Sequence, residues 1–528
     1  MMNRLIKLVW LALLVCMPAA ARADWKEATS ANFVVYSEGS EQQLREFATK
    51  LEKFDRVLRT YHGVTAPPSP IKLKVYLFPS IAAVGRMAGG EGIAGYYISR
   101  ARGLMMVGTR TRTTARSNDS RSTGTEANID AESILLHEYT HHFMYQYFPA
   151  TYPTWYSEGF AEFWGASDIL PNDVVEIGLP ANYRFNSFLF NRWLPLKKLL
   201  TAQSYSDVPD LDLLYAEGWL LVRSAFDDPK RRQQLQAYLN AINGGATYEE
   251  AMNKAFGDIS ALDSQLHEYA GKGRFSVLRL PFRKIEVGPI AVRSVTPAED
   301  AMMTLSIELA QGILKREASE FAGKVRDAAA RFPNDPFALA LLSEAERLAG
   351  NRDAAVAAAD RLLAAAPNDP RGLLQKALAE MDKLKAASSR DAKAWSAARQ
   401  YLVRASRTAP NDPLVLEAFY DSYAGQGVLP PEPAQAALYK AMELAPSDAD
   451  LRYKVAADFE NRDMIEDAIA IIRPAAYVLP HRKGESAKEK KRREEREEKY
   501  RGAGEVKRET AREMLARLQR KLAEKKRG

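Results

Sequence analysis

The sequence predicts an α+β domain in the first half of the chain, followed by an all-α array of helical repeats. Alternating apolar residues, which are typical of strands, occur in NFVVYS (32–37) and IKLKVYLFPS (71–80). Apolar residues at helical spacing occupy 41–62 and most of 131–275. From about residue 300 the composition becomes rich in alanine, and proline recurs at a spacing near 34 residues.

The first half is expected to form a mixed sheet beside a helix that starts near residue 131. The segment GIAGYYISRARGLMMVGT (92–109) predicts a pair of strands. The polar stretch 109–128 predicts a surface loop, with a lid near a cleft as the alternative. Residues 165–275 are mainly helical in pattern and predict a lower lobe that closes the cleft. Residues 276–297 are interrupted by prolines and predict a connector.

A pentapeptide inside the expected helix, His137-Glu138-Tyr139-Thr140-His141, has the pattern H-E-x-x-H. Four residues are just over one helical turn, so His137 and His141 point the same way and can bind one Zn²⁺. Glu138 lies beside the open coordination position, where a carboxylate can take a proton from a zinc-activated water. His142 is rotated by about 100° round the helix and is expected to be packed rather than a ligand.

Catalytic zinc normally has three protein ligands, and the next helix offers the third. In TWYSEGFAEFW (154–164), Glu158 and Glu162 lie one turn apart on one face. Gly159 is expected to let this helix approach the H-E-x-x-H helix closely.

An H-E-x-x-H helix followed by W-Y-x-E-G-x-A-E-F resembles the gluzincin metallopeptidases, in particular their peptidase-MA-like branch. The resemblance covers roughly residues 24–275. It implies His137, His141 and Glu158 as zinc ligands and Glu138 as the general base. It also implies that Glu162 orients a ligand histidine, with an ordinary surface or helix-pair carboxylate as the alternative. In that family an edge strand binds the extended substrate, and Gly95-Tyr96-Tyr97 either belongs to this edge or forms a plain buried strand. The later segment LYAEGW (214–219) resembles a helix of that family, in which Tyr215 is either the oxyanion donor or a core aromatic.

The first 23 residues have the pattern of a secretory signal peptide, with a basic start, the apolar run LVWLALLVCM and the cleavage site Ala21-Arg22-Ala23. We therefore expect an exported, periplasmic protein. Cys16 is the only cysteine, so a mature chain that starts at Asp24 has neither disulfides nor a cysteine nucleophile. Acylation of Cys16 in a lipoprotein is the alternative, but Val15 is bulky for such a site. No later segment has the 18 to 20 or so apolar residues of a membrane span.

The positive charge of the chain is concentrated near its end. The net charge is +7, but residues 481–528 contain 19 Lys or Arg against 10 Glu. The signal segment adds three more positive charges, so the rest of the mature protein is mildly acidic. This distribution, together with the expected export, argues against a nucleic-acid partner. We expect the tail to form a solvated helix that caps the last repeat through Met514, Leu515, Leu518 and Leu522, with contact to anionic lipid as the alternative.

The second half resembles tetratricopeptide repeats. Spacings of 34, 43, 36 and 34 residues separate Pro333, Pro367, Pro410, Pro446 and Pro480. Alanines recur in register, twelve residues before a proline at Ala355, Ala398, Ala434 and Ala468, and five before at Ala328, Ala405, Ala441 and Ala475. A helix–turn–helix unit of this length needs small residues where its helices meet. The resemblance implies an array whose concave face holds a peptide or protein partner.

Together these patterns predict an exported zinc metallopeptidase whose repeats recruit a substrate or a partner protein. The expected boundaries are a signal peptide at 1–23, a metallopeptidase domain at 24–275, a connector at 276–297, repeats at 298–481 and a charged tail at 482–528. The alternative is a repeat-based scaffold whose peptidase-like domain binds zinc without hydrolysis. A zinc hydrolase that acts on a bond other than the peptide bond has the same site chemistry.

Overall fold

The computed structural model describes residues 25–90, 93–110, 113–115, 127–129, 131–178, 193–203, 205–272, 275, 277–282, 284–476 and 509–527. The expected signal peptide and its Cys16 lie outside these residues, as does most of the tail. The part that is described is mostly helical and contains a small mixed sheet and a helical repeat region.

A six-stranded sheet forms the centre of the N-terminal domain. Its strands are β1 (Lys26–Thr29), β2 (Phe33–Ser37), β3 (Leu73–Phe78), β4 (Gly95–Ile98), β5 (Met105–Thr109) and β11 (Ala291–Ser294). Their order is β11-β1-β2-β3-β5-β4, so β4 is an edge strand. The pairs β2–β3 and β3–β5 are parallel, and the others are antiparallel. The strand pair expected at 92–109 is the antiparallel pair β4–β5, with Tyr97 opposite Met106.

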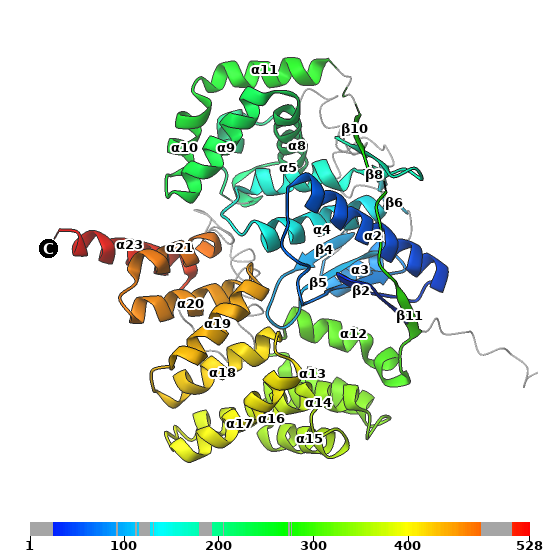
Figure 1. Cartoon of the computed structure of the whole chain (residues 1–528), viewed down its shortest axis with the longest axis vertical. Coiled ribbons are helices and arrows are strands. Elements are labelled where there is room, and N and C mark those ends of the chain that lie inside the picture. The colour runs from blue at the N-terminus through cyan, green and yellow to red at the C-terminus, as the bar shows by residue number, and fades with distance from the viewer. Residues whose placement is uncertain are drawn as a thin grey trace, which may run out of the picture.

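Side chains alternate across the sheet and build two cores, because successive residues of a strand point to opposite faces. Val75 and Leu77 of β3 pack on one face against α2 (Glu41–Tyr61) and α4 (Ala131–Tyr147). Tyr76 and Phe78 pack on the other face with α3 (Ile81–Ala88) and α12 (Pro297–Gln311). The sheet is therefore covered by helices on both faces (Figure 1).

A helical lobe lies above the sheet in Figure 1. It contains α5 (Thr154–Gly165), α7 (Leu196–Thr201), α8 (Leu211–Asp227), α9 (Pro229–Asn243), α10 (Tyr248–Phe256) and α11 (Ile259–Gly271). A small sheet beside it has the order β10-β9-β8, from β8 (Asp168–Ile169), β9 (Val174–Ile177) and β10 (Leu278–Pro281). Residues 276–297, expected as a connector, thus supply β10 to this sheet and β11 to the central one.

The repeat region consists of antiparallel helix pairs. They are α12 with α13 (Ala318–Ala329), α14 (Pro336–Leu348) with α15 (Arg352–Ala365), α16 (Pro370–Ala386) with α17 (Ala392–Thr408), α18 (Pro413–Gln426) with α19 (Glu432–Leu444), and α20 (Ala449–Asn461) with α21 (Ile465–Ala476). The repeated Asp caps the first helix of four pairs, at Asp335, Asp369, Asp412 and Asp448. The four alanines that lie twelve residues before a proline, Ala355, Ala398, Ala434 and Ala468, are at most 1 % exposed, which is what a close helix crossing requires.

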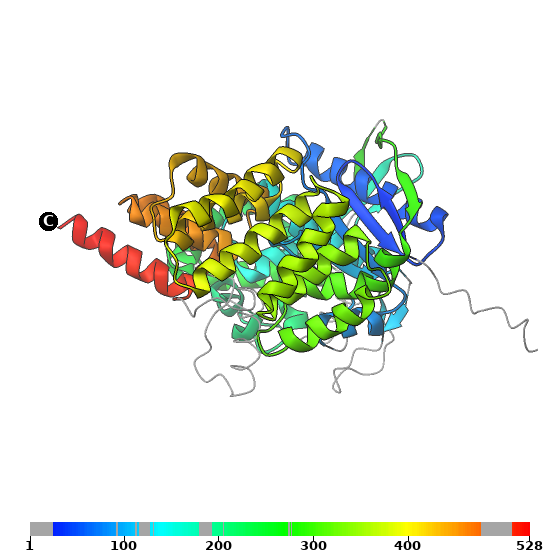
Figure 2. The same cartoon turned by 90° about the horizontal axis from the view of Figure 1, so that it is seen from below.

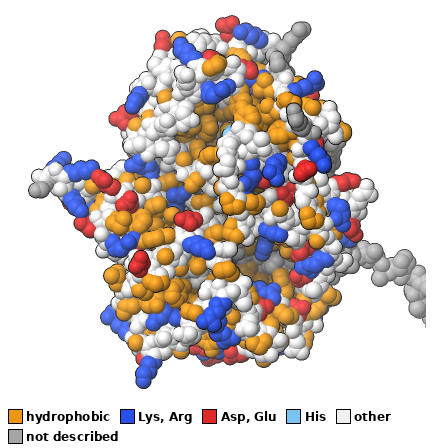
Figure 3. Space-filling view, in the orientation of Figure 1, with side chains coloured by type: hydrophobic (Ala, Val, Ile, Leu, Met, Phe, Trp, Pro, Cys, Tyr) orange, Lys and Arg blue, Asp and Glu red, His pale blue; other side chains and the backbone are white. Residues whose placement is uncertain are grey.

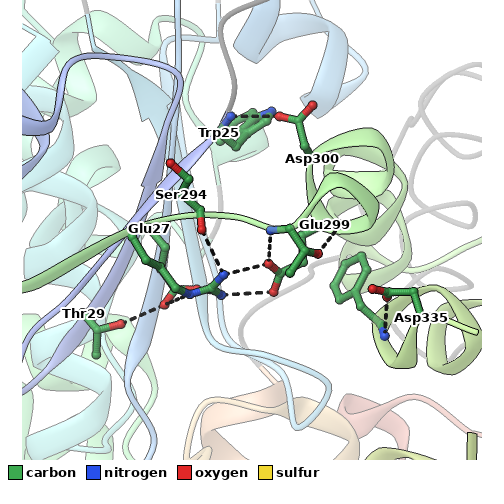
Figure 4. A network of polar contacts seen from close by, with 10 residues as sticks. Trp25, Glu27, Thr29, Ser294, Glu299, Asp300 and Asp335 are labelled. Carbon is green, nitrogen blue, oxygen red and sulfur yellow. Dashed lines mark hydrogen bonds and ion pairs between the residues drawn. The ribbon is translucent and has the colours of Figure 1, made fainter. Parts of the chain in front are cut away.

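The repeats curve around the lower side of the N-terminal domain (Figures 1 and 2). At one end, Arg293 of β11 forms ion pairs with Glu27 of β1 and Glu299 of α12, and the backbone of Trp25 donates to Asp300 (Figure 4). At the other end, Arg473 of α21 donates to the backbone oxygen of Asn243 in α9 at 2.6 Å. The N-terminal domain therefore contacts the repeat region at both ends of the repeat array.

The loop between β4 and β5 is also held by the repeats. The backbone N–H of Ala101 donates to Asp448 Oδ2 at 2.6 Å, and the Ser447 hydroxyl donates to Ser99 Oγ at 2.5 Å. Arg102 forms an ion pair with Glu344 of α14. The edge strand β4 is thus tied to the repeats directly after its last residue.

Two further segments can be compared with the expectations from the sequence, namely the stretch 109–128 and the C-terminal tail. Within the stretch 109–128, β6 (Thr113–Ala115) pairs with β7 (Ala127–Ile129); residues 116–126 lie outside the described part. In the tail, α23 (Ala511–Lys525) packs on α21 through Met514, Leu515 and Leu518, with Leu522 at the margin of the contact. No helix in the described part of the chain has both the length and the hydrophobicity to cross a bilayer.

Candidate metal centre

The two histidines of the H-E-x-x-H motif project from α4 toward the same point. His137 Nε2 and His141 Nε2 are 3.1 Å apart, and their rings are nearly perpendicular. Their side chains keep 14 % and 12 % of their surface exposed, so the site is accessible from solvent. Figure 3 shows hydrophobic side chains gathered in a recess below the α8–α11 lobe, with a histidine visible inside it.

Glu158 on α5 completes a cluster of three donor groups. Its Oε2 lies 3.2 Å from His137 Nε2 and 3.4 Å from His141 Nε2. A tetrahedral zinc site with bonds near 2.0–2.1 Å places its ligand atoms about 3.3 Å apart. The spacing of the three donors therefore fits an ion of this size, and the group can hold a metal ion.

The charges around the cluster favour a cation. Burial opposes ionisation of Glu158, but His141 and His137 outweigh it and hold the pKa of Glu158 well below its usual range. Burial also opposes protonation of His137, yet Glu158, Glu162 and Glu138 together raise the pKa of His137 to about 9. A metal ion would take the place of that proton, since it satisfies the same acidic groups.

Each histidine has a partner on its other ring nitrogen. Ser157 Oγ lies 3.2 Å from His141 Nδ1 and 3.1 Å from the Tyr145 hydroxyl. Glu162 Oε1 lies 3.8 Å from His137 Nδ1, which is ion-pair range rather than a hydrogen bond. Such partners fix the ring orientation and leave the Nε2 atoms free for a metal. The structure thus places Glu162 within ion-pair range of His137, and the contact of Ser157 with His141 was not predicted.

Glu138 lies between α4 and the edge strand. The backbone N–H of Tyr97 in β4 hydrogen bonds to the carboxylate of Glu138. Burial raises the pKa of Glu138, and the two histidines of the motif oppose that rise. A Cβ on Gly95 would lie 2.6 Å from Ile134 Cγ2 and 3.5 Å from Glu138 Cγ, so this strand reaches the helix only because residue 95 is glycine.

Glycine also shapes the helix contacts, but not as the sequence suggested. The expectation that Gly159 faces the H-E-x-x-H helix was wrong, because a Cβ there would meet Gly218 of α8. Gly165, one and a half turns later, lies against α4 instead, where a Cβ would be 2.9 Å from His137 Cβ. Periodicity predicts which face of α5 a residue occupies, but not which helix meets that face.

Two tyrosines lie beside the cluster. The Tyr205 hydroxyl donates to Glu158 Oε1, the carboxylate oxygen that is turned away from the histidines. Desolvation and the charge of Glu158 raise the pKa of Tyr205 well above its usual value, so it remains a donor. The Tyr215 ring on α8 lies 6.2 Å from the His137 ring, between centroids. Tyr215 was singled out from the sequence and Tyr205 was missed, since the 3₁₀ helix Tyr205–Asp207 carries no recognisable pattern.

His142 is packed, as expected from the sequence. Its Nδ1 lies 3.0 Å from the Tyr97 hydroxyl, and only 5 % of the residue is exposed. Burial lowers the pKa of His142 to about 3, so the ring is neutral. It therefore supports the contact between α4 and β4 and takes no part in the cluster.

No protein-family model matches the chain, and a search of curated proteins finds no match. Solved structures with similarity to it include a thermophilic TPR protein in Thermus thermophilus, with 19 % identity and a TM-score of 0.28. That similarity covers 34 % of this chain and 91 % of the other. MamA from Desulfovibrio magneticus is similar over 33 % of this chain and 90 % of its own, with 21 % identity and a TM-score of 0.25.

Proposed function

We propose that the protein is a zinc-dependent peptidase that hydrolyses peptide bonds. The observation that carries this proposal is the convergence of His137 Nε2, His141 Nε2 and Glu158 Oε2 within 3.1–3.4 Å of one another, with Glu138 next to the first ligand in the chain. Two imidazoles and one carboxylate form a donor set that suits zinc. Zinc bound there would act as a Lewis acid that polarises the scissile carbonyl and lowers the pKa of water.

Glu138 is the proposed general base. It would accept a proton from the attacking water and pass it to the leaving nitrogen. Its raised pKa, which burial causes, suits this role because proton transfer is most efficient when the pKa of the base approaches the working pH. The nearby tyrosines supply hydroxyl donors for the oxyanion, and we assign that role to Tyr215 because Tyr205 is engaged with Glu158.

The edge strand β4 is the proposed platform for the substrate backbone. An extended peptide can add to an exposed sheet edge through main-chain hydrogen bonds. The outward N–H of Tyr97 contacts Glu138, so a peptide on this edge would pass directly beside the base. Gly95 allows β4 to lie this close to Glu138, because a Cβ there would clash with Ile134 of α4.

The repeats are proposed to bind a peptide or protein partner as well as to support the N-terminal domain. Part of their surface is already used inside the chain, since Glu344 and Asp448 hold the loop after β4. A partner would therefore bind elsewhere on the repeats or compete with this loop.

The test of the proposed function compares three zinc-loaded proteins on a mixture of unstructured peptides. Loss of the general base in Glu138→Gln should reduce the hydrolysis rate by about 10²- to 10⁴-fold while zinc remains bound. The matched control is Glu132→Gln on the same helix, whose partner is Lys50 and which should stay within a few-fold of the wild type. Full activity of Glu138→Gln would contradict the mechanism. Absence of hydrolysis by the wild type would favour the non-catalytic scaffold.

A further inference from the structure

A pocket of about 130 Å³ lies between the N-terminal domain and the last repeat, beside the metal cluster. Tyr145, Ser157 and Tyr205 line it on one side. Ser157 contacts the ligand His141, and Tyr205 contacts the ligand Glu158. The pocket is therefore lined by two side chains that each contact a metal ligand, and its far wall belongs to the repeats.

The far wall contains a buried cation, Arg452 of α20. This residue is 7 % exposed, and it is the only charged residue among those that line the pocket in the described part of the chain. Its Nε donates to Pro446 O at 2.6 Å and its Nη1 to Ile471 O at 3.1 Å. Both acceptors are neutral carbonyls, so the hydrogen bonds fix the side chain without neutralising it.

The charge of Arg452 is poorly compensated. Among the described residues no carboxylate forms an ion pair with Arg452, and its hydrogen bonds come from Nε and Nη1 alone. The acid that acts on its charge is Asp448, which is already engaged by the N–H groups of Asp450, Leu451 and Ala101. Burial lowers the pKa of Arg452 to about 10, which still leaves the side chain charged at neutral pH. A buried charge without a counter-ion is costly, and a bound anion would offset that cost.

A second hollow continues from the first. It has a volume of about 450 Å³ and shares Pro446, Arg452 and Pro474 with the smaller pocket. It extends over α9, α19 and α21 to Arg473, and its lining also contains Glu443 and Glu466. Arg452 lies where the two hollows meet, so an extended ligand that occupies both hollows passes it.

We propose that this pocket is a substrate pocket of the peptidase and that Arg452 selects a peptide carboxylate in it. The inference rests on the proposed peptidase function and adds the substrate class to it. The carboxylate comes either from an Asp or Glu side chain or from the C-terminus of the peptide, since both present the same group to a guanidinium. The repeats then form part of the active site and contribute its specificity.

The test uses the full-length zinc-loaded protein and matched peptides. In the first pair, the two peptides differ only in having Glu or Gln at one position near the scissile bond, and this position is varied along the peptide. In the second pair, they differ only in having a free or an amidated C-terminus. The wild type should prefer the carboxylate member of one pair by about 10- to 100-fold in kcat/KM, as expected for a hydrogen bond to a charged group. The pair that shows the preference identifies the source of the carboxylate. Equal rates for both members of both pairs would overturn the proposal without any variant.

Variants then assign the preference to Arg452. Arg452→Gln should remove the preference while hydrolysis of the uncharged peptide stays within a few-fold, and Arg452→Lys should restore part of it. The matched control is Arg404→Gln, which loses a similar 2.6 Å bond to a proline carbonyl, Pro367 O, outside the pocket. Equal loss on charged and uncharged peptides would show a purely structural role and contradict the proposal. Zinc content and thermal unfolding of each variant show that it has folded.

A binding measurement separates this inference from the proposed function. N-acetylglutamate and N-acetylglutamine amide, in which both carboxylates are replaced by amides, are titrated into the wild type and into Arg452→Gln. The wild type should bind the acid but not the amide, and Arg452→Gln should bind neither. This result would support the carboxylate site even if no peptide were hydrolysed, and in that case only the peptidase function would be contradicted. Absence of selective binding by the wild type at millimolar concentration would contradict the site.

Discussion

Gly159 of α5 and Gly218 of α8 lie back to back where the two helices cross. A Cβ on Gly159 would be 2.2 Å from the carbonyl carbon of Gly218, and a Cβ on Gly218 would be 2.4 Å from the backbone oxygen of Trp155. The atoms on both sides are backbone atoms, which cannot turn aside. Since Glu158 directly precedes Gly159, the crossing also sets the position of the third donor of the cluster.

Gly159→Ala should therefore destabilise the protein and weaken the metal site. Overpacking of this kind costs about 1–3 kcal/mol or more, and a displaced α5 would carry Glu158 away from the histidines. Urea unfolding and zinc titration measure the two effects. The matched control is Gly323→Ala in α13, where no atom lies within 4 Å of the new methyl and a gain of about 0.5–1 kcal/mol is expected. Equal behaviour of the two variants would show that the crossing tolerates a side chain.

Ser157→Ala should lower zinc affinity without removing a ligand. The variant loses the group 3.2 Å from His141 Nδ1, so the ring is free to turn and its tautomer is less restricted. Loss of such a partner typically weakens metal binding by about 10- to 100-fold. Competition with a chelator of known affinity measures the change. Thr140→Ala serves as control, because its hydroxyl bonds only the backbone of Leu136 on the same helix. An unchanged zinc affinity of Ser157→Ala would exclude the orienting role.

Glu217 should make stability fall as the pH rises from about 5 to 8. Burial, aided by Asp263 and Asp210, raises the pKa of Glu217 to about 8, although it accepts a hydrogen bond from Leu194 N at 2.6 Å. Between its ordinary pKa near 4.5 and this value, the folded state keeps a proton that the unfolded state has lost. The stabilisation is thus complete below the lower pKa and is lost as the pH rises through the window.

Glu217→Gln should reduce this pH dependence. The amide can still accept from Leu194, but it does not titrate, so the difference in unfolding free energy between pH 5 and pH 8 should shrink by about 1–3 kcal/mol. Glu250→Gln is the control, because the hydrogen bonds of Glu250 with Thr247 lower its pKa, and its contribution is lost only at more acidic pH. The prediction fails if the two variants show the same pH profile.

Asp448→Ala should release the loop that follows the edge strand. Asp448 caps α20 and also accepts from the N–H of Ala101 at 2.6 Å. Asp335→Ala removes an equivalent cap from α14, and Asp335 has no such bond to the N-terminal domain among the described residues. Both variants should lose about 0.5–2 kcal/mol of stability. Only Asp448→Ala should speed hydrogen exchange at Ala101, and equal exchange in both would contradict the contact.

The sequence predicts the local parts of the site well, because helix geometry fixes them. His137 and His141 are one turn apart on a single helix, so their convergence follows from spacing alone. Glu158 was identified by its motif on the next helix. Ser157 was overlooked although it directly precedes Glu158, since its role depends on where α5 crosses α4. Tyr205 and Arg452 come from elements 47 and 294 residues beyond Glu158, and only tertiary packing brings Tyr205 to the cluster and Arg452 to the pocket beside it.

For the fold as well, the sequence predicts the local elements but not the contacts between distant parts of the chain. Strands β2 and β3, helix α2 and the paired repeat helices have clear periodicity and agree with the pattern in the sequence. Strand β11 is short and flanked by proline-containing segments, and its pairing with β1 spans more than 260 residues, as in Glu27 opposite Arg293. No periodic pattern encodes such a pairing. The placement of the repeats against the N-terminal domain likewise depends on contacts such as Arg473 with Asn243, which no repeat motif predicts.

The most direct test of the account is the metal content of the full-length protein, measured by elemental analysis after zinc loading and dialysis. The wild type and Glu138→Gln should each retain about one zinc per chain, because Glu138 is not one of the three convergent donors. Glu158→Ala should lose the metal or bind it far more weakly, since it removes a donor 3.2 Å from His137 Nε2 and 3.4 Å from His141 Nε2. A wild type without zinc, or a Glu158→Ala variant that keeps it as tightly, would contradict the proposed centre.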